Sequence, residues 1–235
     1  MSARRKSIVV VGGTGAIGGA VVESLKSEGA NVVSWSLATM SELADLSMTV
    51  DCVVQEEVDA AMAATVRAVG QVDGIVHCVG DIDETIPIAE MTLSRFERTY
   101  RLCVGSALLV AKTSDRLLRE SSGSAVFISS VASTHPYPGI ADYCSAKAAL
   151  DAFVRSWAVE LATAGARVNA IRPAVIDSPL FDRSPYTREE AAGWHALNRI
   201  GRPEEIASLA CWLMSDASSW MTGSVIQFDG GMSLS

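Results

Sequence analysis

Short runs of β-branched residues recur along the chain, and the longer segments between them carry apolar residues every three or four positions. The short runs are bounded by glycine or proline and are typical of strands buried on both faces of a sheet. The longer segments are typical of helices with one apolar face. Strands are expected at 7–11, 31–35, 72–79, 124–130, 167–171 and 223–228, and residues 50–54 are expected to form a third strand or the exit of one. Helices are expected at 16–28, 55–69, 89–112, 141–164 and 203–214.

Strands and helices alternate along the chain, apart from two segments without clear periodicity. Residues 37–49 are polar and are expected to form at most a weak helical turn, and residues 178–201 are irregular. Because parallel strands are joined by crossover helices, the alternation predicts an α/β fold, a doubly wound parallel sheet with helices on both faces. No linker or repeat divides the 235 residues, so we expect a single domain.

Composition and charge narrow the class of protein and partner. With 49% hydrophobic and 20% charged residues, the chain has the composition of an ordinary soluble globular protein. Its net charge of -8 argues against nucleic acid or an anionic membrane as a partner. No segment reaches the ~18 apolar residues of a membrane span, and the run Ile8–Val11 is too short for a signal peptide. The five cysteines form no C-x-x-C pair, which indicates reduced thiols in a cytoplasmic protein, and the three widely separated histidines suggest no metal site.

A glycine-rich turn joins the first expected strand to the first expected helix. Gly12, Gly15 and Gly18 lie in the stretch VGGTGAIG. Glycine permits a tight turn and a close approach of the backbone to a pyrophosphate, while the N–H groups at a helix N-terminus attract an anion. The position of the turn, directly after a strand and opening a helix, favours a dinucleotide site over a plain tight turn.

The stretch from Phe127 to Leu150 contains a candidate proton-transfer site. Tyr143 and Lys147 are four residues apart, so on a helix they share one face, and Ser130 lies thirteen residues before Tyr143 at the exit of a strand. An ammonium beside a phenol stabilises the phenolate, and a nearby hydroxyl can hold a carbonyl oxygen. The pattern predicts chemistry on an alcohol–carbonyl pair, although Tyr-x-x-x-Lys alone also fits a plain pair on a helix surface.

In this order and spacing, the motifs resemble the short-chain dehydrogenase/reductase family over the whole chain. The glycine turn is similar to the family pattern T-G-x-x-x-G-x-G, with Val11 in place of the threonine and Ala16 in place of the middle glycine. The resemblance implies a Rossmann-type NAD(P)-binding domain over residues 1–235, with a substrate loop around 178–201. It implies that Tyr143 exchanges a proton, that Ser130 positions the substrate oxygen, and that Lys147 binds the nicotinamide ribose and lowers the tyrosine pKa. The cofactor-binding residues that it implies are Gly12, Thr14, Gly15, Ala16, Ile17, Gly18, Ser36, Asp51, Cys52, Val79, Gly80, Tyr143, Lys147, Pro173, Ile176 and Ser178, the last of which fits a turn residue as well.

Two positions depart from the family pattern where an asparagine is expected. His77-Cys78-Val79-Gly80 replaces Asn-Asn-Ala-Gly after the fourth strand, and Cys103 replaces the asparagine that many members use in a proton relay to the lysine. We expect His77 and Cys78 to pack in their turn. The relay must be altered, because a thiol is a weak donor and acceptor. Ser106, one turn beyond Cys103, either holds the relay water or only packs.

The choice between NAD and NADP stays open. A carboxylate at the end of the second strand would bind the ribose 2′-hydroxyl, and an arginine would bind a 2′-phosphate. Ser36 occupies this position, and no Lys or Arg occurs from Asn31 to Val66. The loss of the acid indicates NADP, whereas the absence of a base indicates NAD.

The expected substrate is a small, moderately apolar alcohol or carbonyl compound, and a cyclic one fits. The residues that suggest this are His135, Tyr137, Phe181 and Trp194, which fit lid or interface packing equally well. No basic cluster indicates a phosphorylated or CoA-linked substrate. The family resemblance further implies a homo-oligomer, either a tetramer or a dimer.

Three functions are compatible with these residues, and the resemblance favours the first. The first is an NAD(P)-dependent alcohol dehydrogenase or ketoreductase that transfers a hydride between nicotinamide and a secondary alcohol or ketone, with Tyr143 as general acid and base. The second is a cofactor-binding protein with weak or no turnover, suggested by the loss of both asparagines. The third is a non-redox isomerase or dehydratase on the same fold.

Overall fold

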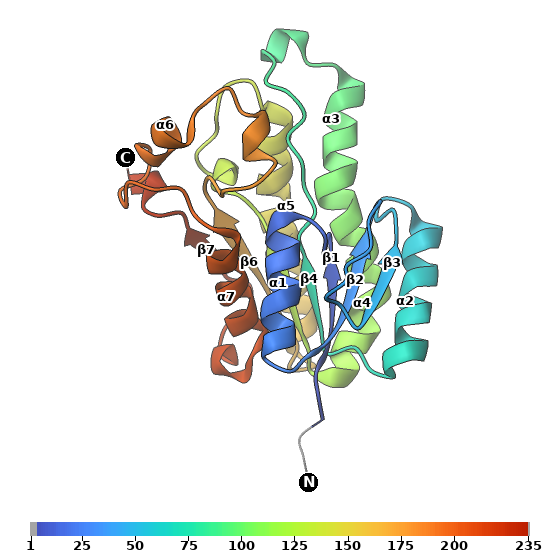
Figure 1. Cartoon of the computed structure of the whole chain (residues 1–235). Helices are drawn as coiled ribbons and strands as arrows, with labels where there is room; N and C mark the ends of the chain where they lie inside the picture. Colours follow the sequence, from blue (N-terminus) through green and yellow to red (C-terminus); the bar gives the residue numbers. More distant parts are fainter. Residues whose placement is uncertain (1–3, 235) are drawn as a thin grey trace.

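The computed structural model describes residues 4–234, which contain a sheet of seven parallel strands (Figure 1). The strands are β1 (Ser7–Val11), β2 (Asn31–Ser36), β3 (Leu46–Thr49), β4 (Gly74–His77), β5 (Ser124–Ile128), β6 (Arg167–Pro173) and β7 (Val225–Phe228). They lie in the order β3-β2-β1-β4-β5-β6-β7. The chain therefore winds outward in opposite directions from β1 and β4, and this reversal opens a crevice at their carboxyl ends. The predicted doubly wound α/β fold is confirmed.

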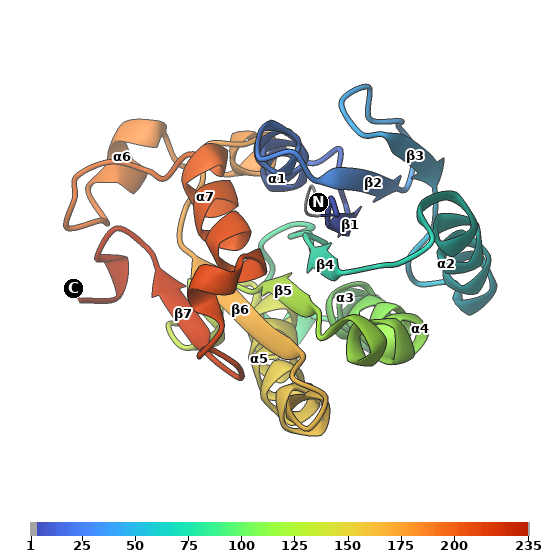
Figure 2. The ribbon, with the colours of Figure 1, turned by 90° about the horizontal axis from the view of Figure 1, so that it is seen from below.

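Helices cover both faces of the sheet. They are α1 (Ala16–Ser27), α2 (Gln55–Val69), α3 (Leu93–Tyr100), α4 (Ser106–Ser121), α5 (Ala141–Ala162), α6 (Arg188–Ala192) and α7 (Pro203–Met214). Figure 2 shows α1 and α7 on one face and α2, α4 and α5 on the other. No helix in the described part of the chain is long and apolar enough to cross a bilayer.

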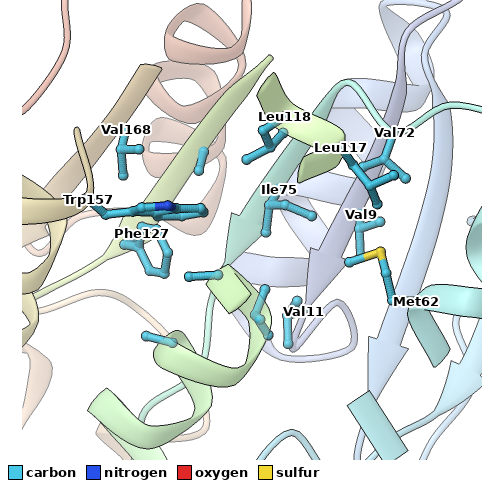
Figure 3. Packing of buried hydrophobic residues seen from close by; sticks show 14 of the residues in the cluster. Val9, Val11, Met62, Val72, Ile75, Leu117, Leu118, Phe127, Trp157 and Val168 are labelled. Carbon is cyan, nitrogen blue, oxygen red and sulfur yellow. The ribbon is translucent and has the colours of Figure 1, made fainter. Parts of the chain in front are cut away.

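Alternate residues of β1 enter two separate cores, one on each face of the sheet. Ile8 and Val10 belong to the core under α1 and α7, whereas Val9 and Val11 belong to the core under α2, α4 and α5. This is the two-residue period of a strand. Figure 3 shows the second core, where the rings of Phe127 and Trp157 meet edge to face with centroids 6.1 Å apart. The two cores fix the strands and thereby the positions of the loops at their carboxyl ends.

Two predicted elements are placed differently in the structure. The third strand is Leu46–Thr49 rather than 50–54, and it pairs with residues 33–36 of β2. As an edge strand with no fully buried residue, it lacks the apolar run by which buried strands are recognised. The helix expected at 89–112 is instead a 3₁₀ turn at Ile88–Glu90, then α3, a π turn at Arg101–Gly105, and α4. Thr92 caps α3 by accepting a hydrogen bond from the Arg95 N–H, so this helix starts later than expected.

Candidate active site

The glycine turn after β1 leaves room for an anion at the start of α1. Gly12 has φ of +79°, a conformation that favours glycine. A Cβ on Gly18 would lie 2.0 Å from the Gly12 carbonyl oxygen, so only glycine fits there, whereas a Cβ on Gly15 would come no closer than 3.4 Å to the same oxygen. No side chain caps α1, which begins with Ala16 and Ile17. The turn and the backbone N–H groups at this helix end therefore fit a pyrophosphate.

Gly13 also shapes the turn, although the sequence interpretation gave it no role. A Cβ on Gly13 would lie 2.3 Å from the Oγ of Ser34 on β2. The contact joins residues that are far apart in sequence, so no local pattern indicated it. Close packing of the turn on β2 depends on this glycine.

Polar groups without net positive charge line the crevice where β2 and β3 end. Ser36 is buried, and its Oγ has no hydrogen-bond partner in the part of the chain that the structure describes. Thr39 donates to Thr14 of the glycine turn at 3.0 Å. Asp51 accepts a hydrogen bond from the Val53 N–H at 3.1 Å, beside Cys52. A ribose hydroxyl is a group that would satisfy Ser36, so the residues at this end fit the predicted dinucleotide.

The three predicted catalytic side chains come together at the start of α5. Tyr143 and Lys147 are both buried, and the Lys147 Nζ lies 5.6 Å from the centre of the Tyr143 ring. Ser130 follows β5, and its side chain lies close enough to Tyr143 to lower the pKa of the phenol. The ammonium of Lys147 donates to the carbonyl oxygens of Ile128 at 2.8 Å and Val79 at 3.3 Å. An ammonium has three donors, so one remains for a ligand such as a ribose hydroxyl.

Opposing effects act on the pKa of Tyr143. Burial raises this pKa and is the largest effect, and Cys103 also raises it. Lys147 and Ser130 lower it, as predicted for Lys147, but they do not outweigh burial, so the pKa lies above its usual value. The phenol is therefore protonated near neutral pH, the form that can donate to a carbonyl oxygen.

The side chains of His77 and Ser106 form a hydrogen bond with each other. The His77 ring is fully buried, packs against Phe127 with centroids 5.3 Å apart, and places its Nε2 2.9 Å from the Ser106 Oγ. The Ser106 hydroxyl donates to the Leu102 carbonyl oxygen, so it has no proton left for a relay water. Burial and the nearby Lys147 lower the pKa of His77 to about 3, so the imidazole is neutral. The packing role expected for His77 agrees with this arrangement.

The residues predicted to surround the nicotinamide lie on two segments, one after β4, where the Val79 carbonyl oxygen accepts from Lys147, and one at and after the end of β6. A Cβ on Gly80 would lie 2.7 Å from the Lys147 Nζ, so a side chain there would displace the ammonium. On the other side, Pro173 ends β6, and Ile176 forms an isolated bridge with residue 201. The Ser178 Oγ donates to the Ile176 carbonyl oxygen at 3.1 Å, which is the contact of a turn residue.

The four residues suggested for the substrate make separate contacts within residues 4–234. Tyr137 donates to the Met232 sulfur at 3.4 Å, and exposed His135 contacts the neighbouring Thr134. Phe181 is buried beneath the guanidinium of Arg188, and Trp194 meets Tyr186 edge to face. A cavity of about 90 Å³ behind Ile176 includes none of the four among its lining residues. The packing interpretation therefore accounts for Phe181 and Trp194 in this structure.

Comparison with known proteins gives a consistent result. A family model described as enoyl-(acyl carrier protein) reductase matches residues 12–233. The chain is 32% identical to the 2,5-dichloro-2,5-cyclohexadiene-1,4-diol dehydrogenase of Sphingobium indicum, over 96% of each chain. It belongs to the short-chain dehydrogenase/reductase family. A solved short-chain dehydrogenase/reductase of Mycobacterium ulcerans superposes with a TM-score of 0.92 at 30% identity, over 100% of this chain and 92% of the other. The 3beta-hydroxysteroid dehydrogenase 1 of Eggerthella lenta is 28% identical over 97% and 94% of the two chains.

Membership in this family agrees with the chemistry predicted from the motifs. The chain is an NAD(P)-dependent oxidoreductase of the type that transfers a hydride between nicotinamide and an alcohol or ketone. The glycine turn, the free end of α1 and the buried hydroxyl of Ser36 are the features of this chain that fit such a cofactor.

Proposed function

We propose that the chain interconverts a cyclic secondary alcohol and its ketone, with Tyr143 as general acid and base. The observation that carries the proposal is the meeting of Ser130, Tyr143 and Lys147 beside the carboxyl ends of β4 and β5. The Lys147 Nζ lies 5.6 Å from the centre of the Tyr143 ring, and Ser130 is close enough to Tyr143 to lower the pKa of its phenol.

Each of the three side chains has a distinct part in the proposed reaction. Ser130 donates to the substrate oxygen and orients it toward Tyr143. In ketone reduction the Tyr143 phenol gives its proton to that oxygen, and in alcohol oxidation the phenolate takes the proton back. Lys147 stabilises the phenolate and offers its remaining N–H to the cofactor ribose. Bound NAD(P) supplies the hydride or accepts it.

The proposed substrate class is supported by two of the relatives. One is named for a cyclohexadienediol and the other for a hydroxysteroid, so both act on alcohols of ring compounds. In this chain Tyr143 belongs to a buried apolar cluster with Ala132 and Ile140, so apolar walls flank the proposed reaction site. Such walls suit the face of an apolar ring better than a charged chain.

The proposal is tested by following label from deuterated cofactor into a panel of cyclic ketones that includes cyclohexanone and a 3-ketosteroid. Tyr143→Phe should lower kcat by about a hundredfold or more, the usual effect of losing a general acid. Tyr137→Phe is the matched control, because it removes a phenol hydroxyl that contacts Met232 rather than Ser130. Absence of label transfer by the unmodified chain, or equal rates for it and Tyr143→Phe, would refute the proposal.

We further propose that the chain prefers NAD(H) to NADP(H). Neutral hydroxyl contacts lie in the loop after Ser36, namely Thr39 with Thr14 and Ser47 with the Ser41 N–H, and no Lys or Arg occurs from Asn31 to Val66. A 2′-phosphate carries negative charge and would need a cationic partner in this region. Fluorescence titration with NADH and NADPH tests the preference, and tighter binding of NADPH would refute it.

A cytoplasmic homo-oligomer is also proposed. Large apolar side chains remain exposed on α4, α5, α7 and β7, among them Leu108, Val159, Trp212 and Phe228. Groups of exposed apolar residues are typical of contact surfaces between subunits. The five free cysteines suit a reducing compartment. Light scattering on the eluting protein should give a mass of two or four chains, and a monomeric mass would refute the assembly.

A further inference from the structure

A π turn lies directly behind the ammonium of Lys147. It spans Arg101–Gly105 between α3 and α4, and Cys103 is its buried central residue. π turns are rare and occur mostly at functional sites. A Cβ on Gly80 would lie 2.7 Å from the Lys147 Nζ and 3.8 Å from the Cys103 Sγ, so the two side chains border the same small space.

A short chain of hydrogen bonds connects this turn to the end of β4. The Ser106 hydroxyl donates to the carbonyl oxygen of Leu102, which belongs to the π turn. A hydroxyl has one proton, so its oxygen must accept from its second partner, the His77 Nε2 at 2.9 Å. His77 therefore carries its proton on Nε2. All three residues that make or frame these bonds, His77, Cys103 and Ser106, are fully buried.

The two backbone segments that these hydrogen bonds connect both lie beside Lys147. His77 is two residues before Val79, whose carbonyl oxygen accepts from the Lys147 Nζ at 3.3 Å. Leu102 is the residue before Cys103, which faces the space beside that ammonium. A shift of either backbone segment would move a neighbour of Lys147, while the contact with Ile128 at 2.8 Å would remain.

We propose that His77 and Ser106 are positioning residues for hydride transfer, because their hydrogen bond fixes the π turn and thereby holds Cys103 and the Val79 carbonyl around Lys147. The inference rests on the proposed function, since the placement of Lys147 matters for the rate only if Tyr143 exchanges the proton.

The test compares two substitutions of similar size at position 77. In His77→Gln the side-chain amide can still donate to Ser106, whereas His77→Met removes the donor. We expect kcat to fall roughly five- to tenfold in His77→Met and in Ser106→Ala, the effect of one lost buried hydrogen bond. His77→Gln should stay within about twofold of the unmodified chain, and the double variant His77→Met/Ser106→Ala should be no slower than either single variant, because both remove the same bond. KM for the fastest ketone of the panel and the Kd of NADH should change little.

Several results would overturn the inference. They are an unchanged kcat in Ser106→Ala, an equal loss in His77→Gln and His77→Met, multiplied losses in the double variant, or a change confined to KM. Ser106→Ala removes only an oxygen atom, so it keeps the test valid if His77→Met does not fold. Tyr143→Phe in the same assay separates failure of the proposed function from failure of this inference. Normal turnover in that variant refutes the proposed function and this inference with it. Loss of turnover in Tyr143→Phe without any effect at positions 77 and 106 refutes the inference alone.

Discussion

A buried ion pair ties the start of α3 to the start of the catalytic helix. Arg95 is 6% exposed and Asp142 is 2% exposed. The Arg95 Nε donates to the Asp142 Oδ2 at 3.0 Å, and Thr99 donates to the same oxygen at 2.9 Å. Burial alone would raise the pKa of Asp142, but the hydrogen bonds from Arg95 and Thr99 outweigh it, so the pKa lies below its usual value. Removal of the cation should therefore leave a costly buried carboxylate.

The perturbation is Arg95→Met, which keeps most of the apolar stem and deletes the charge. Breaking a buried pair by removing one partner costs about 3–5 kcal/mol. In a chain of this length each kcal/mol corresponds to about 2–4 °C in Tm, so Tm should fall by roughly 6–20 °C. The double variant Arg95→Met/Asp142→Leu leaves no buried charge and should recover most of the loss.

Thermal and urea unfolding at a series of pH values measure the effect. In the unmodified chain the folded pKa of Asp142 is lowered below 3.8, so its stabilising contribution is present above that pH and is lost as the pH falls through the folded pKa. In Arg95→Met the folded pKa rises instead, so that variant gains stability relative to the unmodified chain as acid protonates Asp142. The difference in unfolding free energy should be largest near pH 7 and should shrink toward pH 4.

Arg98→Met is the matched control on the same helix. Arg98 pairs with Asp83 at 2.5 Å, but both side chains are more than half exposed. Exposed pairs contribute about 0–1 kcal/mol, so this variant should unfold almost like the unmodified chain. The reasoning is refuted if Arg95→Met costs no more than Arg98→Met, if its cost does not depend on pH, or if the double variant is as unstable as the single one.

Three further predictions concern the crevice. Gly18→Ala should abolish NADH binding in a fluorescence titration, because its Cβ would lie 2.0 Å from the Gly12 oxygen, whereas Gly15→Ala should bind within a few-fold of the unmodified chain. Ser36→Arg should shift the ratio of NADPH to NADH affinity by roughly tenfold or more, since an arginine–phosphate contact is charge-assisted. Burial raises the pKa of Cys52 to about 11 and that of Cys78 to about 12. Because the thiolate is the nucleophile, both should react with iodoacetamide at pH 8 at least about a hundredfold more slowly than a free thiol, as measured by mass spectrometry.

Sequence periodicity predicted the regular parts of the fold well. The helices 55–69 and 203–214 were predicted with the bounds that the structure gives, because each has an apolar stripe and clear ends. The third strand was misplaced because Leu46–Thr49 lies at the sheet edge and needs no apolar run. The π turn at Arg101–Gly105 could not be predicted, because its residues fit an ordinary helix equally well.

The candidate site was predicted where its residues follow a fixed spacing, and missed where contacts join distant segments. Tyr143 and Lys147 share a helix face because of their spacing alone. Ser130 lies near them because the end of β5 is close to the start of α5. The bond between His77 and Ser106 links residues 29 positions apart, so no local pattern contained it. The sequence leaves open whether Ser106 holds a water or packs, and the structure shows its hydroxyl bonded to Leu102 and His77.

The neutrality of His77 explains how a titratable residue can stand beside the catalytic lysine. A charged imidazolium there would repel the ammonium of Lys147 and add a second buried cation. Burial and that same ammonium lower the pKa of His77 to about 3, so at physiological pH it contributes a hydrogen-bond donor and no charge. Lys147 therefore remains the cation that lowers the pKa of Tyr143. An asparagine amide would also be a neutral donor, so the histidine preserves the electrostatics of the site while its longer side chain reaches Ser106 on α4.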